Sequence, residues 1–322
     1  MNGLEQKDLS SLHKSVLLHE LSESIIIFKD KKNIIVDCTL GMGGHAKEII
    51  KRLNKGDIFI GFDADKRNLD IAKPYLLKEF DGKGIEFFFV NDNFENLKLN
   101  LSKIGIEYIT GIYYDLGISS LHVDEAERGF SFKLNGPLDM RYNVNSGITA
   151  SQILNSYKED ELVKIFFEYG EESQAKKIAK EILVKRKSGF RFKDTKDLTS
   201  LIESITSYPK TKNKIFQALR IEVNKELETI EKSIKDAIEL LLEGGSIFVI
   251  SFHSLEDRII KNIFRDETRD CNCRELICVC RHKKRLKNIF KKPLLPSQTE
   301  IKANPRSRSA KARFAIKLAN KN

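Results

Sequence analysis

The sequence predicts an α/β fold, a Rossmann-like parallel sheet into which a mostly helical second domain is inserted. A strand, a glycine turn and a helix follow one another within residues 33–50, and several later strands end in a carboxylate. Residues 121–245 separate two of the expected strands and are far more than a crossover connection requires. The chain has 322 residues, 41% of them hydrophobic, which can bury the cores of roughly two domains.

The sheet is expected to begin in the stretch NIIVDCTLGMGGHAKEII, residues 33–50. The β-branched run 34–36 is typical of a parallel strand buried on both faces, and Asp37 places a carboxylate at its carboxyl edge. Gly41, Gly43 and Gly44 allow a tight turn and a close approach of backbone to a ligand. The stretch also satisfies the G-x-G-x-x-A fingerprint, which alone does not separate a nucleotide-type site from an ordinary glycine-rich turn.

The next strands bring further candidate side chains to the same edge. The second strand, DIFIGFDAD, places Asp63 nineteen residues after Gly44, a spacing typical of a carboxylate that accepts from ribose hydroxyls. The third, IEFFFV, leads to Phe94, which either contacts an adenine or packs in the core. The fourth ends at Asp115. Because carboxyl ends of parallel strands share one edge, these βα units are predicted to aim at one site.

The inserted region is expected to form a helical cap, with apolar residues at helical spacing between 158 and 207. A long helix from about Asn213 to the glycines at 244–245 should lead directly to the fifth strand. The alternating stretch AKARFAIKL predicts a half-buried strand that closes the sheet edge. The predicted domains are therefore residues 1–120, an inserted helical domain at 121–212, and residues 213–322, which return to the sheet and carry a basic C-terminal region.

The positive charge of the chain is local. Residues 281–322 have a net charge of +13, which leaves about −3 for the first 280 residues. Such a region suits the phosphates of a nucleic acid, although a solvated basic tail is the alternative. Apolar residues interleaved with the charges favour a folded region. Since no run approaches the ~18 apolar residues of a membrane span, we expect a soluble, cytoplasmic protein with no membrane partner.

Four of the five cysteines, Cys271, Cys273, Cys278 and Cys280, lie within ten residues, and Cys38 stands apart. This is not a disulfide framework for a chain of this size, and it fits a reducing compartment. Four close thiols could form a tetrahedral zinc site, but C-x-C pairs are tighter than the usual C-x₂₋₄-C spacing. A reduced surface loop therefore ranks first, zinc second and disulfides last.

Six motifs, in order and essentially from end to end, resemble the bacterial ribosomal RNA small subunit methyltransferase H family, which modifies cytosine N4 in 16S ribosomal RNA. They are DCTLGMGGHA, YYDLGISS, DEAERGFSFKLNGPLDMR, FQALRIEVNKEL, SFHSLEDR and NPRSRSAKAR. The resemblance implies a class I, Rossmann-like methyltransferase with S-adenosyl-L-methionine as cofactor. It implies methyl transfer to the exocyclic N4 amine of a cytidine in the decoding region. The partner is then small-subunit ribosomal RNA or the assembled small subunit, and no protein partner is implied.

The resemblance also implies six residues that contact the cofactor. One position departs from the family, because Leu121 and His122 replace its usual Pro-Gln pair and put a side-chain amide contact in doubt. His122 is kept as a candidate in its place. The predicted cofactor residues are Gly43, Gly44, His45, Asp63, Phe94, Asp115 and His122.

The reaction is an in-line transfer from a sulfonium to a nitrogen, so positioning dominates and neither a strong base nor a metal is expected. Hydrogen-bond acceptors on the cytosine amine favour a pyramidal, reactive nitrogen, and Asp115, Ser119 and Ser120 are the predicted catalytic residues. A lower-ranked set is expected to line the pocket for the base, with caps and loop hydrogen bonds as the alternative roles. This set is Asp139, Arg141, Asn224, His253 and Ser254.

Two other classes of function compete. A nicotinamide-dependent oxidoreductase would explain the glycine turn and Asp63, but it gives the basic region no use. A noncatalytic ribosome-assembly factor would explain the charge, but not strands that end in carboxylates beside a glycine turn. Both rank below the methyltransferase.

Overall fold

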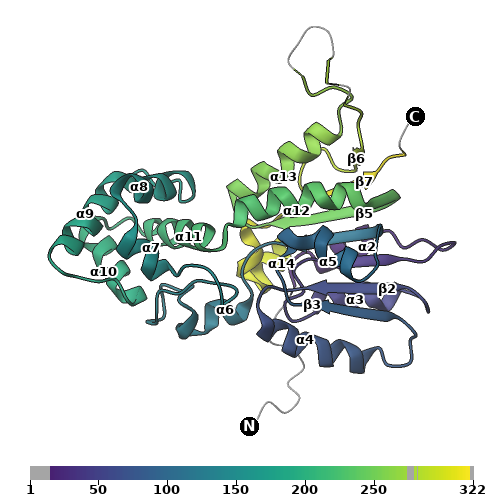
Figure 1. Cartoon of the computed structure of the whole chain (residues 1–322), viewed down its shortest axis with the longest axis horizontal. Helices are drawn as coiled ribbons and strands as arrows, with labels where there is room; N and C mark the ends of the chain where they lie inside the picture. Colours follow the sequence, from purple (N-terminus) through teal and green to yellow (C-terminus); the bar gives the residue numbers. More distant parts are fainter. Residues whose placement is uncertain (1–14, 274–278, 281, 320–322) are drawn as a thin grey trace. The chain divides into compact units, whose positions relative to one another are not determined.

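The computed structural model describes residues 15–273, 279–280 and 282–319, with only the backbone of Ser120 described. The chain divides into two compact units (Figure 1). The sheet unit comprises Met1–Gly117 and Thr229–Asn322, and the helical unit comprises Ile118–Glu228. The helical unit has its own hydrophobic core, separate from the two core clusters of the sheet unit.

The sheet unit contains a seven-stranded sheet of order β3-β2-β1-β4-β5-β7-β6. Strands β1 to β5 are parallel, and β7 runs antiparallel to both β5 and β6. The α/β, Rossmann-like prediction is confirmed, and the strand order reverses between β1 and β4, where such sheets bind their ligands. The strands are β1 Ile34–Asp37, β2 Ile58–Phe62, β3 Glu86–Val90, β4 Ile109–Asp115, β5 Leu241–Ser251, β6 Leu286–Asn288 and β7 Lys311–Lys317.

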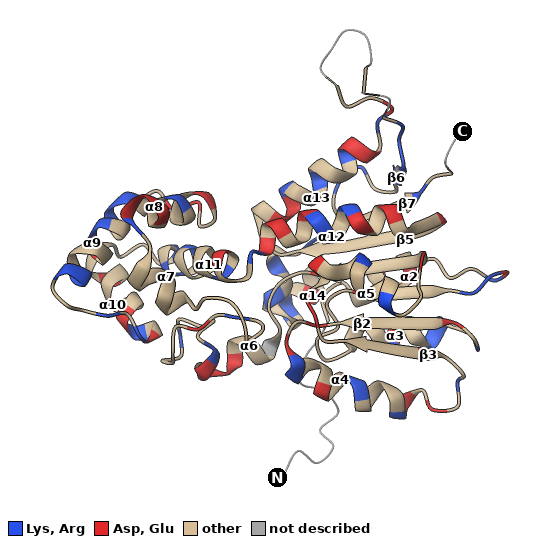
Figure 2. Ribbon diagram, viewed as in Figure 1, with Lys and Arg blue, Asp and Glu red and all other residues tan. Residues whose placement is uncertain are grey.

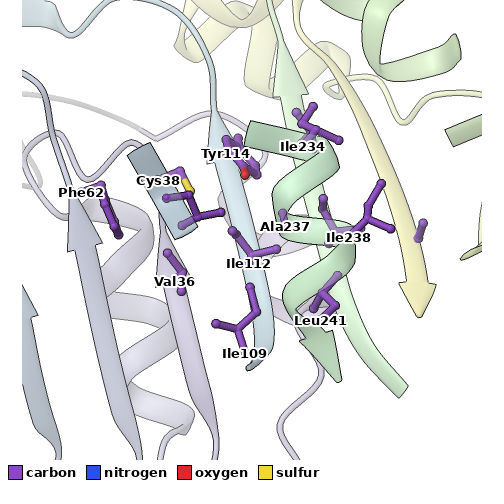
Figure 3. Packing of buried hydrophobic residues seen from close by; sticks show 14 of the residues in the cluster. Val36, Cys38, Phe62, Ile109, Ile112, Tyr114, Ile234, Ala237, Ile238 and Leu241 are labelled. Carbon is purple, nitrogen blue, oxygen red and sulfur yellow. The ribbon is translucent and has the colours of Figure 1, made fainter. Parts of the chain in front are cut away.

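Helices cover both faces of this sheet, which explains why β1 and β2 are continuous apolar runs rather than alternating ones. One face packs against α5 (Leu97–Lys103), α12 (Glu226–Leu240) and α13 (Ser254–Glu267). Figure 3 shows part of this core, where Ile112 and Tyr114 of β4 lie beside Ile234 and Ile238 of α12. The other face packs against α2 (Leu18–Ser24), α3 (Gly44–Arg52) and α4 (Lys66–Glu79).

Strand β7 was expected to close the sheet edge, and this prediction is wrong because β6 lies outside it. Strand β6 has only three residues and sits in the basic stretch RHKKRLKNIF, so it shows no alternation that would reveal it. Its first residue, Leu286, is buried. Next to it, Arg285 donates two hydrogen bonds of 2.6 Å to the Glu267 carboxylate. This part of the basic region is therefore folded, not a solvated tail.

The helical unit holds the helices expected between 158 and 207, and their predicted apolar residues are buried in its core. Short hydrogen-bonded caps begin several of them, such as Thr149 before α7, whose hydroxyl accepts from Gln152 N. The helices of this unit are α6 Ser120–Asp124, α7 Ala150–Ser156, α8 Glu159–Glu168, α9 Ala175–Lys187, α10 Thr195–Ile205 and α11 Lys210–Asn224, with a 3₁₀ turn at Ala126–Arg128.

The single long helix expected from about Asn213 is wrong, because α11 and α12 are separate helices. They meet at Lys225, whose φ of 49° and ψ of 40° are left-handed and end α11. Apolar residues continue at helical spacing across the break, so periodicity does not reveal it. Helix α11 packs against α7, α8 and α10 of the helical unit. The boundary therefore lies at Glu228, whereas the sequence placed it between 212 and 213.

The C-terminal part of the sheet unit is completed by α14 (Gln298–Ala303) and a 3₁₀ turn at Pro305–Ser309, which lead into β7. Within the described residues, no helix combines the length and the apolar character that crossing a membrane requires.

Candidate functional site

The glycine turn between β1 and α3 requires glycine for steric reasons. Gly41 and Gly43 have φ of 53° and 82°, a left-handed conformation that side chains disfavour. A Cβ on Gly44 would lie 2.2 Å from Ser15 Oγ, so the backbone there is in close contact with the N-terminal segment. Helix α3 begins at Gly44, and the turn therefore presents backbone at the carboxyl edge of β1.

Asp63 follows β2 and is fixed against this turn. Its Oδ2 accepts hydrogen bonds from Gly41 N at 2.8 Å and from Asn68 Nδ2 at 3.1 Å. Its Oδ1 accepts from Asp65 N at 2.8 Å. The structure thus brings the predicted ribose acceptor to the glycine turn, as the sequence spacing predicts. Its role toward a cofactor stays a prediction.

Asp115 ends β4 and lies beside His45, a predicted cofactor residue on α3. The His45 ring is buried, and its Nε2 is 2.9 Å from Val16 O. A carbonyl only accepts, so Nε2 carries the proton in this bond. The other nitrogen, Nδ1, is 3.5 Å from Asp115 Oδ2. The second oxygen, Asp115 Oδ1, is buried and has no hydrogen-bond partner among the described residues, which marks it for a ligand that donates.

Burial perturbs the carboxyls at these strand ends. Burial raises the pKa of Asp115 well above its ordinary range, and the nearby charges of Asp37 and Glu256 raise it further. Burial also raises the pKa of Asp37 from 3.8 to about 7, although the Thr39 N–H opposes this effect. Asp63 adds a third acid to the group. A cation bound here would lower these pKa values and stabilise the carboxylates.

Phe94 begins a 3₁₀ turn after β3, Phe94–Asn96. Its ring packs edge-on against Tyr114 of β4, with centroids 5.6 Å apart and planes at 85°. The ring is partly buried against the sheet core. Phe94 therefore packs in the core, which is one of the two roles considered for it. Contact with an adenine stays a prediction.

Ser119, Ser120 and His122 belong to the helical unit, whereas Asp115 belongs to the sheet unit. Ser119 caps α6, since its Oγ accepts from His122 N at 3.4 Å and His122 Nδ1 accepts from Ser119 N at 3.3 Å. The buried His122 ring stacks on Phe130, with centroids 4.8 Å apart. Capping and stacking account for Ser119 and His122 within their own unit, and their roles in catalysis and cofactor binding stay predictions.

The lower-ranked pocket residues hold their own loops together. Arg141 forms a two-pronged ion pair with Asp139, with bonds of 2.9 and 2.8 Å. Asn224 on α11 donates to Met140 O and accepts from Tyr142 N, both at 2.8 Å. The helical unit thus uses these side chains to fix the GPLDMRYN loop, which is the structural alternative weighed for them.

His253, another of the lower-ranked pocket residues, also has a structural role. After β5, His253 and Glu256 cap the start of α13.

Sequence reasoning gave no role to Thr39, which links two strand ends. Its N–H donates to Asp37 Oδ1 at 2.9 Å, and its Oγ1 accepts from Asp115 N at 2.7 Å. The D-x-T spacing directly after β1 was the available signal, because a carboxylate commonly accepts from the N–H two residues later.

Comparison with known proteins decides the family. The model of the MraW methylase family matches residues 10–318. This chain belongs to that family. It is 45% identical, over 95% of its length and 99% of the relative, to "Ribosomal RNA small subunit methyltransferase H" of Clostridioides difficile strain 630. The proteins of the same name from Halothermothrix orenii and Finegoldia magna are each 42% identical, over 96% and 95% of this chain and 99% and 98% of the relatives.

We expect the MraW-family site to make stability fall as pH rises, through Asp37. Its folded-state pKa of about 7 lies above the ordinary 3.8, so folding favours the protonated form. This contribution is complete below about pH 4 and is lost as pH rises through about 7. Asp37→Asn, which mimics the neutral acid, should therefore raise the free energy of unfolding by about 2–4 kcal/mol near pH 8 and by little near pH 4.

Denaturant unfolding of both proteins across this pH range measures the difference. Asp70→Asn is the matched control, because Asp70 is exposed on α4 and pairs with Lys66 on the surface of the same helix. The control removes only an exposed i,i+4 ion pair, so it should change stability by no more than about 0.5 kcal/mol at any of these pH values. A gain for Asp37→Asn that does not depend on pH would contradict the assignment.

Proposed function

We propose that this MraW-family methylase transfers a methyl group from S-adenosylmethionine to the exocyclic N4 amine of a cytidine in the decoding region of small-subunit ribosomal RNA. The observation that carries the proposal is the near full-length match to relatives named for small-subunit ribosomal RNA methylation. The substrate is either the RNA alone or the assembled small subunit. Either one places the protein in the cytoplasm.

The residues at the sheet edge suit S-adenosylmethionine, which has a ribose diol, an adenine and a cationic sulfonium, and which supplies an electrophilic methyl group. The Asp63 carboxylate, fixed beside the glycine turn, suits the diol. Gly43 and Gly44 bring the turn to this edge, where its backbone N–H groups suit the methionine carboxylate. The acids Asp37 and Asp115 suit the positive charge of the sulfonium. Among the described groups that shift the pKa values of these two buried carboxyls, none is a cation.

Asp115 is the group best suited to the acceptor nitrogen. The cytosine amine is a poor nucleophile, and a hydrogen bond from its N–H to Asp115 Oδ1 would favour a localised lone pair. As the N–C bond forms and the S–C bond breaks, the nitrogen loses one proton. The burial that raises the pKa of Asp115 makes its carboxylate a stronger base than an ordinary one, and a bound cation would favour that ionised form.

The target base must leave its stack to meet this edge of the sheet. Single-stranded or loop RNA allows this at low cost, whereas a base inside a helix must first be unpaired. The exposed basic region of the sheet unit would bind the flanking phosphates. Figure 2 shows Lys and Arg along the segments of β6 and β7.

Transfer of labelled methyl groups tests the function directly. We expect transfer to small-subunit RNA or to small subunits, with label recovered as N4-methylcytidine after nucleoside analysis. RNA binding without transfer to either substrate would favour the noncatalytic assembly factor instead. Label in another nucleoside would contradict the N4 assignment alone.

In the same assay, Asp115→Asn should reduce the single-turnover rate by ~10²-fold or more at saturating cofactor and RNA, because the amide keeps one acceptor but loses the charge. Raising the cofactor concentration should not restore the rate. Restoration would show that Asp115 only binds the cofactor. Asp70→Asn, on the exposed surface of α4, serves as the control and should transfer at the normal rate.

Charge reversal of the basic region should weaken RNA binding and flatten its salt dependence. Lys287, Lys291 and Lys292 are exposed, whereas Arg285 is tied to Glu267 and its replacement would disturb the fold. If each lysine meets one phosphate of single-stranded RNA, the triple Lys→Glu variant should lower the slope of log K against log salt by about 2. Filter binding at several salt concentrations measures the slope.

The matched control is a second triple Lys→Glu variant on exposed positions elsewhere in the sheet unit, Lys55, Lys78 and Lys103. Cofactor affinity should be unchanged in both variants. An equal loss of slope in both would show that only total charge matters. An unchanged slope in the first variant would assign RNA binding to another basic surface, such as α9 with its six Lys and Arg residues.

A further inference from the structure

Three cysteine sulfurs gather where the chain leaves α13 and returns toward β6. The Sγ atoms of Cys271 and Cys273 are 3.0 Å apart, and those of Cys280 and Cys271 are 3.8 Å apart. All three lie within 4.8 Å of one another. Sulfurs bound at about 2.3 Å to a tetrahedral zinc lie about 3.8 Å apart. The Cys280–Cys271 separation equals this spacing, and the Cys271–Cys273 pair would have to open by about 0.8 Å to bind the same ion.

The alternative of a disulfide does not fit these positions. No disulfide joins any of the described cysteines. The shortest separation, 3.0 Å, is well beyond the ~2.05 Å of an S–S bond. Three sulfurs separated by up to nine positions in the sequence converge here, which a reduced surface loop does not require.

The contacts around the sulfurs close the base of this segment. His282 Nε2 donates to Asp266 O at 3.1 Å, near the end of α13. Lys284 Nζ is 3.1 Å from Asp270 Oδ2, one residue before Cys271. The chain on either side of the sulfurs is thus held together by the protein itself, and the thiols are brought into proximity at a fixed place.

The chemistry of the donors selects the ion. Three sulfurs form a soft donor set, which suits zinc and does not suit magnesium or calcium. The thiolate is the form that binds a metal ion. Repulsion between crowded thiolates would be relieved by a bound cation.

We propose that Cys271, Cys273 and Cys280 bind a structural zinc ion, which fastens the chain after α13 to the segment that enters β6. The three sulfurs supply three corners of a tetrahedron and leave one corner for a further ligand. Cys278, the remaining thiol of the CNCRELICVC run, lies outside the described residues and is not part of the proposed site. The proposal does not depend on the methyl-transfer reaction.

Metal analysis of the full-length protein, purified under reducing conditions without chelator, tests the site. We expect about one zinc per chain. The double variant Cys271→Ser, Cys273→Ser should lose the zinc, and so should Cys280→Ser, which changes the segment that leads toward β6. Cys38→Ala is the matched control, because Cys38 is buried in the sheet core and should leave the zinc in place.

Cobalt substitution gives an independent readout. Added cobalt should produce the thiolate charge-transfer absorption and the visible bands of a tetrahedral thiolate site in the wild-type protein and in Cys38→Ala, but not in the cluster variants. Circular dichroism should show that the cluster variants remain folded, since none of the three cysteines belongs to a core cluster. Wild-type protein with neither zinc nor a cobalt–thiolate band would overturn the proposal.

Hydrogen exchange separates a structural zinc from an incidental one. Amides between His282 and Asn288 should exchange more slowly in zinc-loaded than in chelator-treated protein, whereas those of α9 should not change. Equal exchange in both states would overturn the structural role. A disulfide in the air-oxidised protein together with no metal in the reduced protein would show that the cluster is a redox pair instead.

Discussion

The site depends on one hydrogen bond between neighbouring strand ends, from Gly41 N to the Asp63 carboxylate. It joins the turn after β1 to the end of β2, and it needs the left-handed backbone that glycine provides at position 41. Thr39 makes the corresponding link to β4, because its hydroxyl accepts from Asp115 N. Two short bonds thus tie three strand ends together at the point where the strand order reverses, and they fix Asp63 and Asp115 there.

This arrangement costs stability. Buried carboxyls repel one another and lose hydration, which is why the pKa of Asp37 rises to about 7 and that of Asp115 well above its ordinary range. A fold selected for stability alone would place an amide or an apolar residue at position 37. Retaining the acids is reasonable if a cationic ligand offsets their repulsion, since binding to the folded state alone then stabilises it. The same electrostatics that weaken the empty protein would therefore favour the charged cofactor.

The sequence predicted the sheet well because β1 and β2 are apolar runs that end in acids, a local signal that packing does not alter. It failed where structure depends on distant contacts. Strand β6 exists because β7 offers it a partner, and the break at Lys225 arises because α11 and α12 pack in different units. Asp63 and His45 were found through motif position, whereas the cap at Ser119 and the stacked ring of His122 depend on neighbours that no spacing reveals.

The basic region shows how such distant contacts bear on function. A flexible lysine-rich tail loses conformational entropy when it binds RNA, whereas a folded surface has already lost it. Here Leu286 is buried, Arg285 is paired with Glu267, and β6 holds Lys287 exposed on the sheet edge. The lysine side chains of this segment therefore extend from an ordered backbone. The three cysteines lie where the chain enters this segment, so an ion bound there would extend the same order toward α13, and the arrangement of the lysines would then depend on the metal as well as on the sheet.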